Sequence, residues 1–201
     1  MKKMKKIYLI SVLILLLLPS VSSAIPYTFS PNPSDLYDLD AADYYNWGVY
    51  QVFDGSGIVS ATLTFSNIIN LYGNLEQDVL HLNLLDNTEQ FVGVQVFSDS
   101  GDQSNAFEGQ GVLLASVYGI PVAPPPVDYV YTFTAAQIGY LNSFALDGYF
   151  GIGIDPQCHY FNDGITLTIN TVRVPEPTTL LLLGSGLVGM GLLGRRKFRR
   201  G

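Results

Sequence analysis

The feature that most limits the fold of this chain is a strict alternation of side chains over residues 58–67. The apolar set in this stretch comprises Val59, Ala61, Leu63 and Phe65, and the polar set comprises Ser60, Thr62, Thr64 and Ser66. Successive side chains of a strand point to opposite faces, so a period of two predicts a strand with one face in a core. We therefore expect the apolar set to be buried against a second layer of the protein.

Further strand patterns follow at short spacing, separated by turns rich in glycine, proline and aspartate. They cover residues 47–53, 78–86, 91–98, 111–118, 127–134, 149–154 and 164–170. One stretch, 135–145, instead has Ala135, Ile138 and Leu141 at helical spacing, and residues 25–46 suggest an irregular entry segment. Many short strands with one helix predict an all-β fold, an antiparallel β-sandwich with jelly-roll-like connections and one short helix.

The N-terminus has the pattern of a secretory signal peptide. Lysines at positions 2, 3, 5 and 6 precede an apolar stretch over residues 7–18, and small residues stand at Ser22 and Ala24. This order predicts a signal peptide at residues 1–24 with cleavage after Ala24. The alternative is an uncleaved anchor, but the apolar stretch is short for that role.

The C-terminus, residues 174–201, carries three elements in a fixed order. Pro175, Glu176 and Pro177 come first, and the two prolines favour an extended backbone. The uncharged residues 178–194 would span about 25 Å as a helix, slightly less than a hydrocarbon core of roughly 30 Å. A basic block then favours the cytoplasmic side as a stop-transfer signal; it comprises Arg195, Arg196, Lys197, Arg199 and Arg200.

This order of elements resembles the PEP-CTERM sorting signal of Gram-negative bacteria. The resemblance implies recognition by an exosortase, a membrane-embedded cysteine transpeptidase, and cleavage near Pro175–Pro177. It also implies passage through the inner membrane to the cell surface or an exopolysaccharide matrix. Residues 153–165 are similar to β-sandwich ectodomains that accompany this signal, which supports the fold alone. The alternative is an ordinary single-span anchor behind two prolines.

Charge restricts the ligands of the exported domain, residues 25–173. Of 10 Lys and Arg residues, four lie in the signal peptide and five in the basic tail, which leaves Arg173. Of 17 Asp and Glu residues only Glu176 lies outside the domain, so 16 remain and the formal charge is −15. Such a domain is a poor partner for nucleic acid or other polyanions. Cations and neutral glycans are compatible ligands, although the acids also serve solubility.

Two groups of residues are candidates for binding. Asp155, Asn162 and Asp163 are expected at neighbouring turns, where their oxygens suit Ca²⁺; the alternative is that they cap turns. Several aromatic residues near polar turns suit a sugar, although we expect at least two-thirds of them to be buried; they are Tyr44, Tyr45, Trp47, Tyr149, Tyr160 and Phe161.

Catalysis has little support in the sequence. The domain has two histidines and one cysteine, Cys158, so a zinc site of about four such ligands or a Ser-His-Asp triad has poor prospects. We expect Cys158 to be a buried thiol; an intermolecular link is the alternative. The sequence predicts a non-catalytic surface protein associated with exopolysaccharide. The alternatives are a calcium-dependent carbohydrate-binding module and, with less support, a glycoside hydrolase, which needs only two carboxylates.

Overall fold

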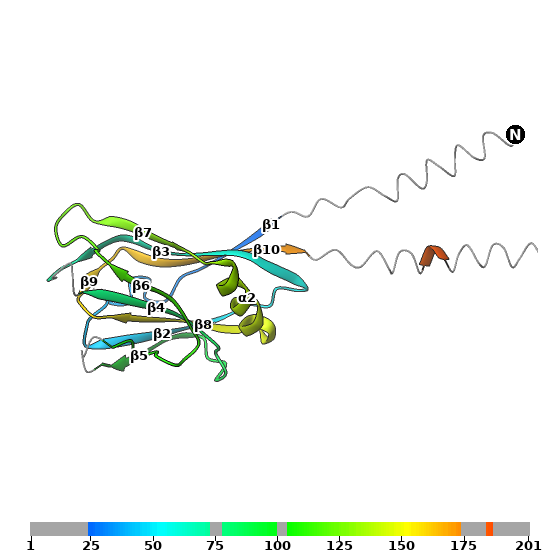
Figure 1. Ribbon diagram of the computed structural model, residues 1–201, viewed down its shortest axis with the longest axis horizontal. Helices are drawn as coiled ribbons and strands as arrows, with labels where there is room; N and C mark the ends of the chain where they lie inside the picture. The colour runs from blue at the N-terminus through cyan, green and yellow to red at the C-terminus, as the bar shows by residue number, and fades with distance from the viewer. Residues whose placement is uncertain (1–23, 73–77, 100–103, 174–183, 187–201) are drawn as a thin grey trace, which may run out of the picture. The chain divides into compact units, whose positions relative to one another are not determined.

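The computed structural model describes residues 24–72, 78–99, 104–173 and 184–186. Residues 24–172 form a compact unit in which two sheets face each other across a shared core (Figure 1). The first sheet has the order β1-β10-β3-β7, with β9 also paired to β3, and the second has the order β5-β2-β8-β4-β6. The all-β prediction is confirmed; the jelly-roll-like connection stays a prediction.

The strand and helix bounds are as follows. The first sheet contains β1 (Ala24–Phe29), β3 (Ser56–Asn70), β7 (Val127–Thr132), β9 (Tyr160–Phe161) and β10 (Gly164–Arg173). The second sheet contains β2 (Asp43–Tyr50), β4 (Val79–Leu85), β5 (Gly93–Ser98), β6 (Val112–Tyr118) and β8 (Tyr149–Pro156). The helix α2 (Ala135–Phe144) continues into a 3-10 turn, η1 (Ala145–Asp147). All four pairings within the second sheet are antiparallel.

The core lies between the inner faces of the sheets. Leu63 of β3 and Leu167 of β10 are fully buried from one side, and Leu82 of β4 and Ile152 of β8 from the other. Full burial of such a side chain stabilises the fold by about 1.5–3 kcal/mol. The alternating pattern that predicted this core is therefore confirmed for Ala61, Leu63 and Phe65, which have no exposed surface.

The prediction was wrong for Val59, which is 53% exposed, whereas its neighbour Ile58 is 5% exposed. Asn142 of α2 explains the shift. Its side-chain oxygen accepts from the Ile58 backbone N–H, and its side-chain nitrogen donates to the Ile58 carbonyl, both at 2.9 Å. A helix side chain thus supplies both hydrogen bonds of the Ile58 backbone near the start of β3. Ile58 faces inward there, and the alternation that begins at Ala61 is shifted by one residue relative to Ile58.

The predicted helix is confirmed at residues 135–144. Thr134 precedes it, accepts from the Gln137 N–H at 3.3 Å, and donates its own N–H to the Gln137 side chain at 2.8 Å. This reciprocal capping box satisfies two backbone donors that a helix N-terminus leaves unpaired. Ile138 and Leu141 face the core as expected, whereas Ala135 is exposed.

The expectation of an irregular segment over residues 25–46 was wrong, because β1 and the start of β2 lie within it. The prolines in and after β1 led us to expect irregular structure there. Pro26 lies on an edge strand opposite Asn170, and an edge strand tolerates a proline because one row of its N–H groups needs no partner. Between these strands Leu36 and Leu39 are fully buried, so this loop also contributes to the core.

Candidate functional site

One row of residues crosses the second sheet on its outer face. Adjacent members are direct cross-strand partners; in order from β5 to β6 they are Gln95, Asn46, Gly153, Asn83 and Leu113. Their neighbours along β4, Leu82 and Leu84, point into the core, so alternation places the row on the opposite face. The row therefore gives the outer face three amide side chains with a glycine between them.

The central glycine makes room for an aromatic ring from a neighbouring segment. Residues 104–111, here called the cap segment, connect to β6, and the Phe107 ring lies above Gly153. A Cβ on Gly153 would stand 2.8 Å from the Phe107 Cε2 atom, closer than real contacts allow. Three hydrogen bonds attach the cap segment to the second sheet and to Gln157, which follows β8. The Ala106 N–H donates to Asp155 Oδ2 at 2.8 Å, and Asn105 Nδ2 donates to Asn83 Oδ1 at 3.0 Å. Gln157 Nε2 donates to the Ser104 carbonyl at 3.1 Å.

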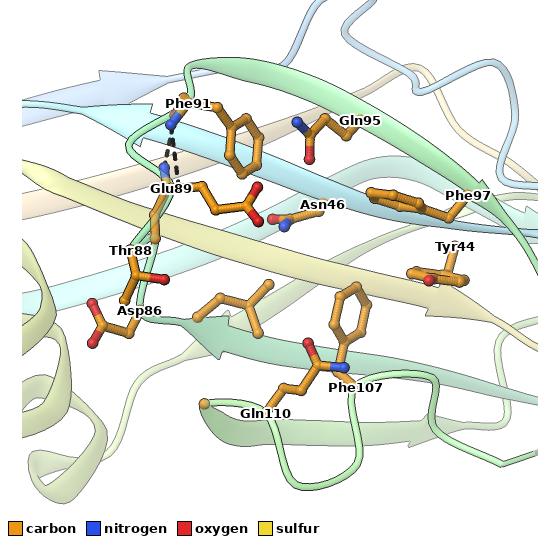
Figure 2. Close-up of a pocket in the computed structure, with 13 residues that line it drawn as sticks. Tyr44, Asn46, Asp86, Thr88, Glu89, Phe91, Gln95, Phe97, Phe107 and Gln110 are labelled. Atoms are coloured by element: carbon orange, nitrogen blue, oxygen red, sulfur yellow. Dashed lines mark hydrogen bonds between the residues drawn. The ribbon is translucent and has the colours of Figure 1, made fainter.

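A pocket of about 290 Å³ lies beside the cap segment, over the Asn46 and Gln95 half of the row. Figure 2 shows that aromatic rings border it. Tyr44 stacks on Phe97 with ring centroids 5.1 Å apart and 15° between the planes, and it meets Phe107 edge-on at 5.3 Å. Phe97 is 40% exposed, so its ring has surface left to cover. The volume is at the small end of the range for ligand pockets.

Polar groups complete this pocket. The Asn46 Oδ1 atom is enclosed and has no hydrogen-bond partner among the described residues. Asn87 also lines the pocket; it bonds both backbone groups of Phe91, at 2.7 and 3.3 Å, and this fixes the loop that carries Glu89. Figure 2 shows the Glu89 carboxylate directed toward Asn46. An unpaired buried acceptor costs about 1–3 kcal/mol; because protein atoms enclose this oxygen, a ligand hydroxyl would bond it only after the Asn46 side chain turns toward the pocket.

Asp155 does not lie at a turn, as the sequence suggested, but inside β8, and it has no exposed surface. Its two oxygens accept from the Ala106 N–H and from Gln157 Nε2, at 2.8 and 2.9 Å. Burial raises the pKa of this carboxyl above its ordinary value, and the nearby Asp99 raises it further, although the Ala106 hydrogen bond opposes the shift. In the structure Asp155 therefore holds the cap segment on the sheet.

Asn162 and Asp163 lie in the turn before β10, in the other sheet. Asn162 is buried; its Nδ2 donates to the Asp35 carbonyl and its Oδ1 accepts from the Gly164 N–H. Asp163 accepts from Asn67 Nδ2 at 2.6 Å. These partners differ from those of Asp155, and in the part of the chain that the structure describes no three His, Cys, Asp or Glu side chains gather as metal ligands do. Calcium binding at these three residues stays a prediction.

The aromatic residues singled out in the sequence divide between core and surface. Tyr45, Trp47 and Tyr160 are buried, Tyr44 and Tyr149 are partly buried, and Phe161 is exposed. Sequence reasoning thus included Tyr44 but missed Phe97, Phe107 and Gln95. The pairing of β2 with β5 places Phe97 and Gln95 opposite Tyr44 and Asn46, and this register is not visible in either strand alone.

Cys158 is partly buried and free. Its thiol donates to Asn70 Oδ1 at 3.0 Å. Burial raises the pKa of the thiol, and the nearby Asp78 raises it further. A thiol that stays protonated is a poor nucleophile, because the thiolate is the reactive form.

The comparison with known families concerns the other end of the chain. Residues 173–200 match the PEP-CTERM protein-sorting motif, so the chain carries the sorting signal that its sequence predicted. This motif is the signal that exosortases recognise, and it supports an exported protein. A comparison with curated proteins finds no relative.

The remaining predictions for the two ends concern residues that the structure mostly leaves undescribed. Pro175–Pro177, the basic block and all of residues 1–24 except Ala24 lie outside the described residues. Of the predicted membrane span at 178–194, only the helical residues 184–186 are described. Among described residues, no helix is long and apolar enough to cross a membrane.

Proposed function

We propose that this chain is an exported surface protein, processed by an exosortase, whose sandwich domain binds a neutral glycan of the surrounding exopolysaccharide without altering it. The observation that carries the binding half is the stacked pair of Tyr44 and Phe97 beside the amide side chains of Asn46 and Gln95. Aromatic faces cover the apolar side of a sugar ring, and amides and carboxylates bond its hydroxyl groups. The −15 charge of the domain favours an uncharged glycan over an anionic one.

A non-catalytic role is supported by the state of the groups that could act as catalysts. His81 bonds Ser116 Oγ at 3.0 Å through Nδ1, but its Nε2 has no partner among the described residues. Asp155, opposite His81 on the next strand, uses its oxygens for the cap segment and Gln157. A Ser-His-Asp triad needs the carboxylate hydrogen-bonded to the histidine, and that contact is missing here.

Glycan binding is tested on an array of neutral and anionic glycans with the purified full chain. Phe97→Ala should weaken binding about tenfold, because the ligand would cover the exposed part of this ring for about 1.4 kcal/mol. Phe161→Ala is the matched control, since Phe161 is 38% exposed but lies on β9 in the other sheet. Equal effects of the two variants, or no binding to any neutral glycan, would refute the proposed site.

Two further arms separate the alternatives. A calcium-dependent module would lose binding in the presence of a chelator, whereas the proposed site would keep it. A glycoside hydrolase would release reporter groups from synthetic sugars, and Asp86 and Glu89 at the pocket are the carboxylates to replace in that case. Release of the reporter that depends on either residue would overturn the non-catalytic half of the proposal.

The sorting half is tested by replacing Pro175, Glu176 and Pro177 with alanine in the native host. We propose a single-pass intermediate in the inner membrane that an exosortase cuts near these residues. Mass spectrometry of the surface protein should then show that the basic tail is absent, and the alanine variant should retain the tail in the inner membrane. An intact C-terminus on the wild-type surface protein would favour the plain anchor.

A further inference from the structure

A second pocket, of about 330 Å³, lies on the other side of the cap segment from the first. Its lining includes His81, Asn83 and Ser116 from β4 and β6, together with Leu113, which is 50% exposed. His81 is 8% exposed, and its Nε2 atom has no hydrogen-bond partner among the described residues. This pocket therefore combines an accessible apolar surface with an unsatisfied buried polar group, the same combination that marks the first.

The two pockets share a wall and a floor. Phe107, Gln110 and Gly111 line both of them. The row of cross-strand partners runs beneath both, with Gln95 and Asn46 in the first pocket and Asn83 and Leu113 in the second. Neighbouring strands are about 4.8 Å apart, so the four steps of this row span about 19 Å. That length exceeds one sugar ring, and each pocket alone is small.

We propose that the two pockets form one binding surface for a linear, uncharged oligosaccharide that lies across the strands, with its middle in contact with Gln110 and Gly111, which are exposed and line both pockets. This inference rests on the proposed function for the choice of a neutral glycan. The row ends on the edge strands β5 and β6, at Gln95 and at Leu113, so among the described residues no further strand of this sheet lies beyond either end. The site therefore takes an internal segment of a chain and not a chain end, as retention in a polymer requires.

The test compares a disaccharide with a hexasaccharide by isothermal titration calorimetry, for linear glucan, mannan, galactan and xylan oligosaccharides. The wild-type chain should bind the hexasaccharide of at least one series ten or more times more tightly, since about 1.4 kcal/mol from the second pocket is a tenfold change. Leu113→Arg obstructs the second pocket and should abolish this gain with length. Val130→Arg is the matched control, because Val130 is 55% exposed on β7 of the other sheet.

The outcomes separate this inference from the proposed function. If Leu113→Arg binds the hexasaccharide as tightly as the wild-type chain, the second pocket takes no part and the inference is wrong, while the first pocket keeps its role. If the wild-type chain binds none of the oligosaccharides, both are wrong. Leu113→Ala, which removes apolar contact without adding bulk, covers the case in which the arginine variant does not fold, and it should reduce the gain with length about threefold.

Discussion

Replacing Gly153 with alanine tests whether the cap segment is packed on the sheet as described. The added methyl group would stand 2.8–3.0 Å from three ring atoms of Phe107. Phe107 is 2% exposed and rests edge-on against Tyr44, so the ring has little room to retreat. The expected consequence is an outward displacement of Phe107 and a loss of its packing against Tyr44, in the part of the cap segment that separates the two pockets.

The size of the effect follows from two opposing contributions. Alanine in place of glycine in a strand gains about 0.5–1 kcal/mol, because the unfolded glycine is the more disordered. Forcing an extra carbon into a filled space costs about 1–3 kcal/mol. We therefore expect Gly153→Ala to lower the free energy of unfolding by about 1–2 kcal/mol, which is about 2–8 °C in melting temperature for a domain of this size.

Gly139→Ala supplies the same chemical change with the opposite expected sign. Gly139 lies within α2, on its exposed side, and an added Cβ meets no atom within 4 Å. The alanine should raise the free energy of unfolding by about 0.5–1 kcal/mol. Thermal unfolding followed by circular dichroism compares both variants with the wild-type chain. If Gly153→Ala raises the free energy of unfolding as much as Gly139→Ala does, Phe107 does not lie over Gly153, and the cap segment is not packed on the sheet as described.

Three further predictions concern the helix cap, the Asp155 carboxyl group and calcium. Thr134→Ala removes the helix cap and should lower the free energy of unfolding by about 1 kcal/mol in urea denaturation; an unchanged value would contradict the capping role. Burial raises the pKa of Asp155, so the folded state holds this proton more tightly than the unfolded chain does. Its contribution to stability is therefore full below the ordinary aspartate pKa of about 3.9 and is lost as pH rises through the raised pKa. Asp155→Asn should flatten that part of the stability–pH curve, and a curve identical to that of the wild-type chain would refute the assignment. Calcium, predicted at Asp155, Asn162 and Asp163, should raise the melting temperature more than sodium at equal ionic strength, and Asp163→Ala should remove the difference; equal shifts in the two salts would count against a specific site.

Much of the fold could be predicted because burial imposes a local pattern on each strand. The period of two in β3 and the spacing of Ile138 and Leu141 in α2 are both set by which face meets the core. The errors fell where a partner from elsewhere decides the local structure. Val59 faces outward next to Ile58, whose backbone N–H and carbonyl are hydrogen-bonded to the Asn142 side chain. Pro26 can belong to a strand because that strand lies at a sheet edge.

The candidate site was harder to predict for the same reason. Asp155 stood out in the sequence as an acid before a proline, but only the cap segment buries it and gives its carboxylate a partner in Ala106. Tyr44 stood out as an aromatic residue near polar turns, but its stacking on Phe97 comes from the pairing of β2 with β5. Neither pairing has a local signature, because the partners lie about 50 residues apart in the chain.

The sequence by itself determined the sorting signal, the charge of the exported domain and the β architecture. A sorting signal is read as a short linear order of residues, and a core requires alternation within each strand, so both are written locally. Only the tertiary structure decided that amides from β2, β4 and β5 line up with Gly153 beneath the Phe107 ring. That arrangement depends on strand order and register, which are set by contacts between segments distant in the chain.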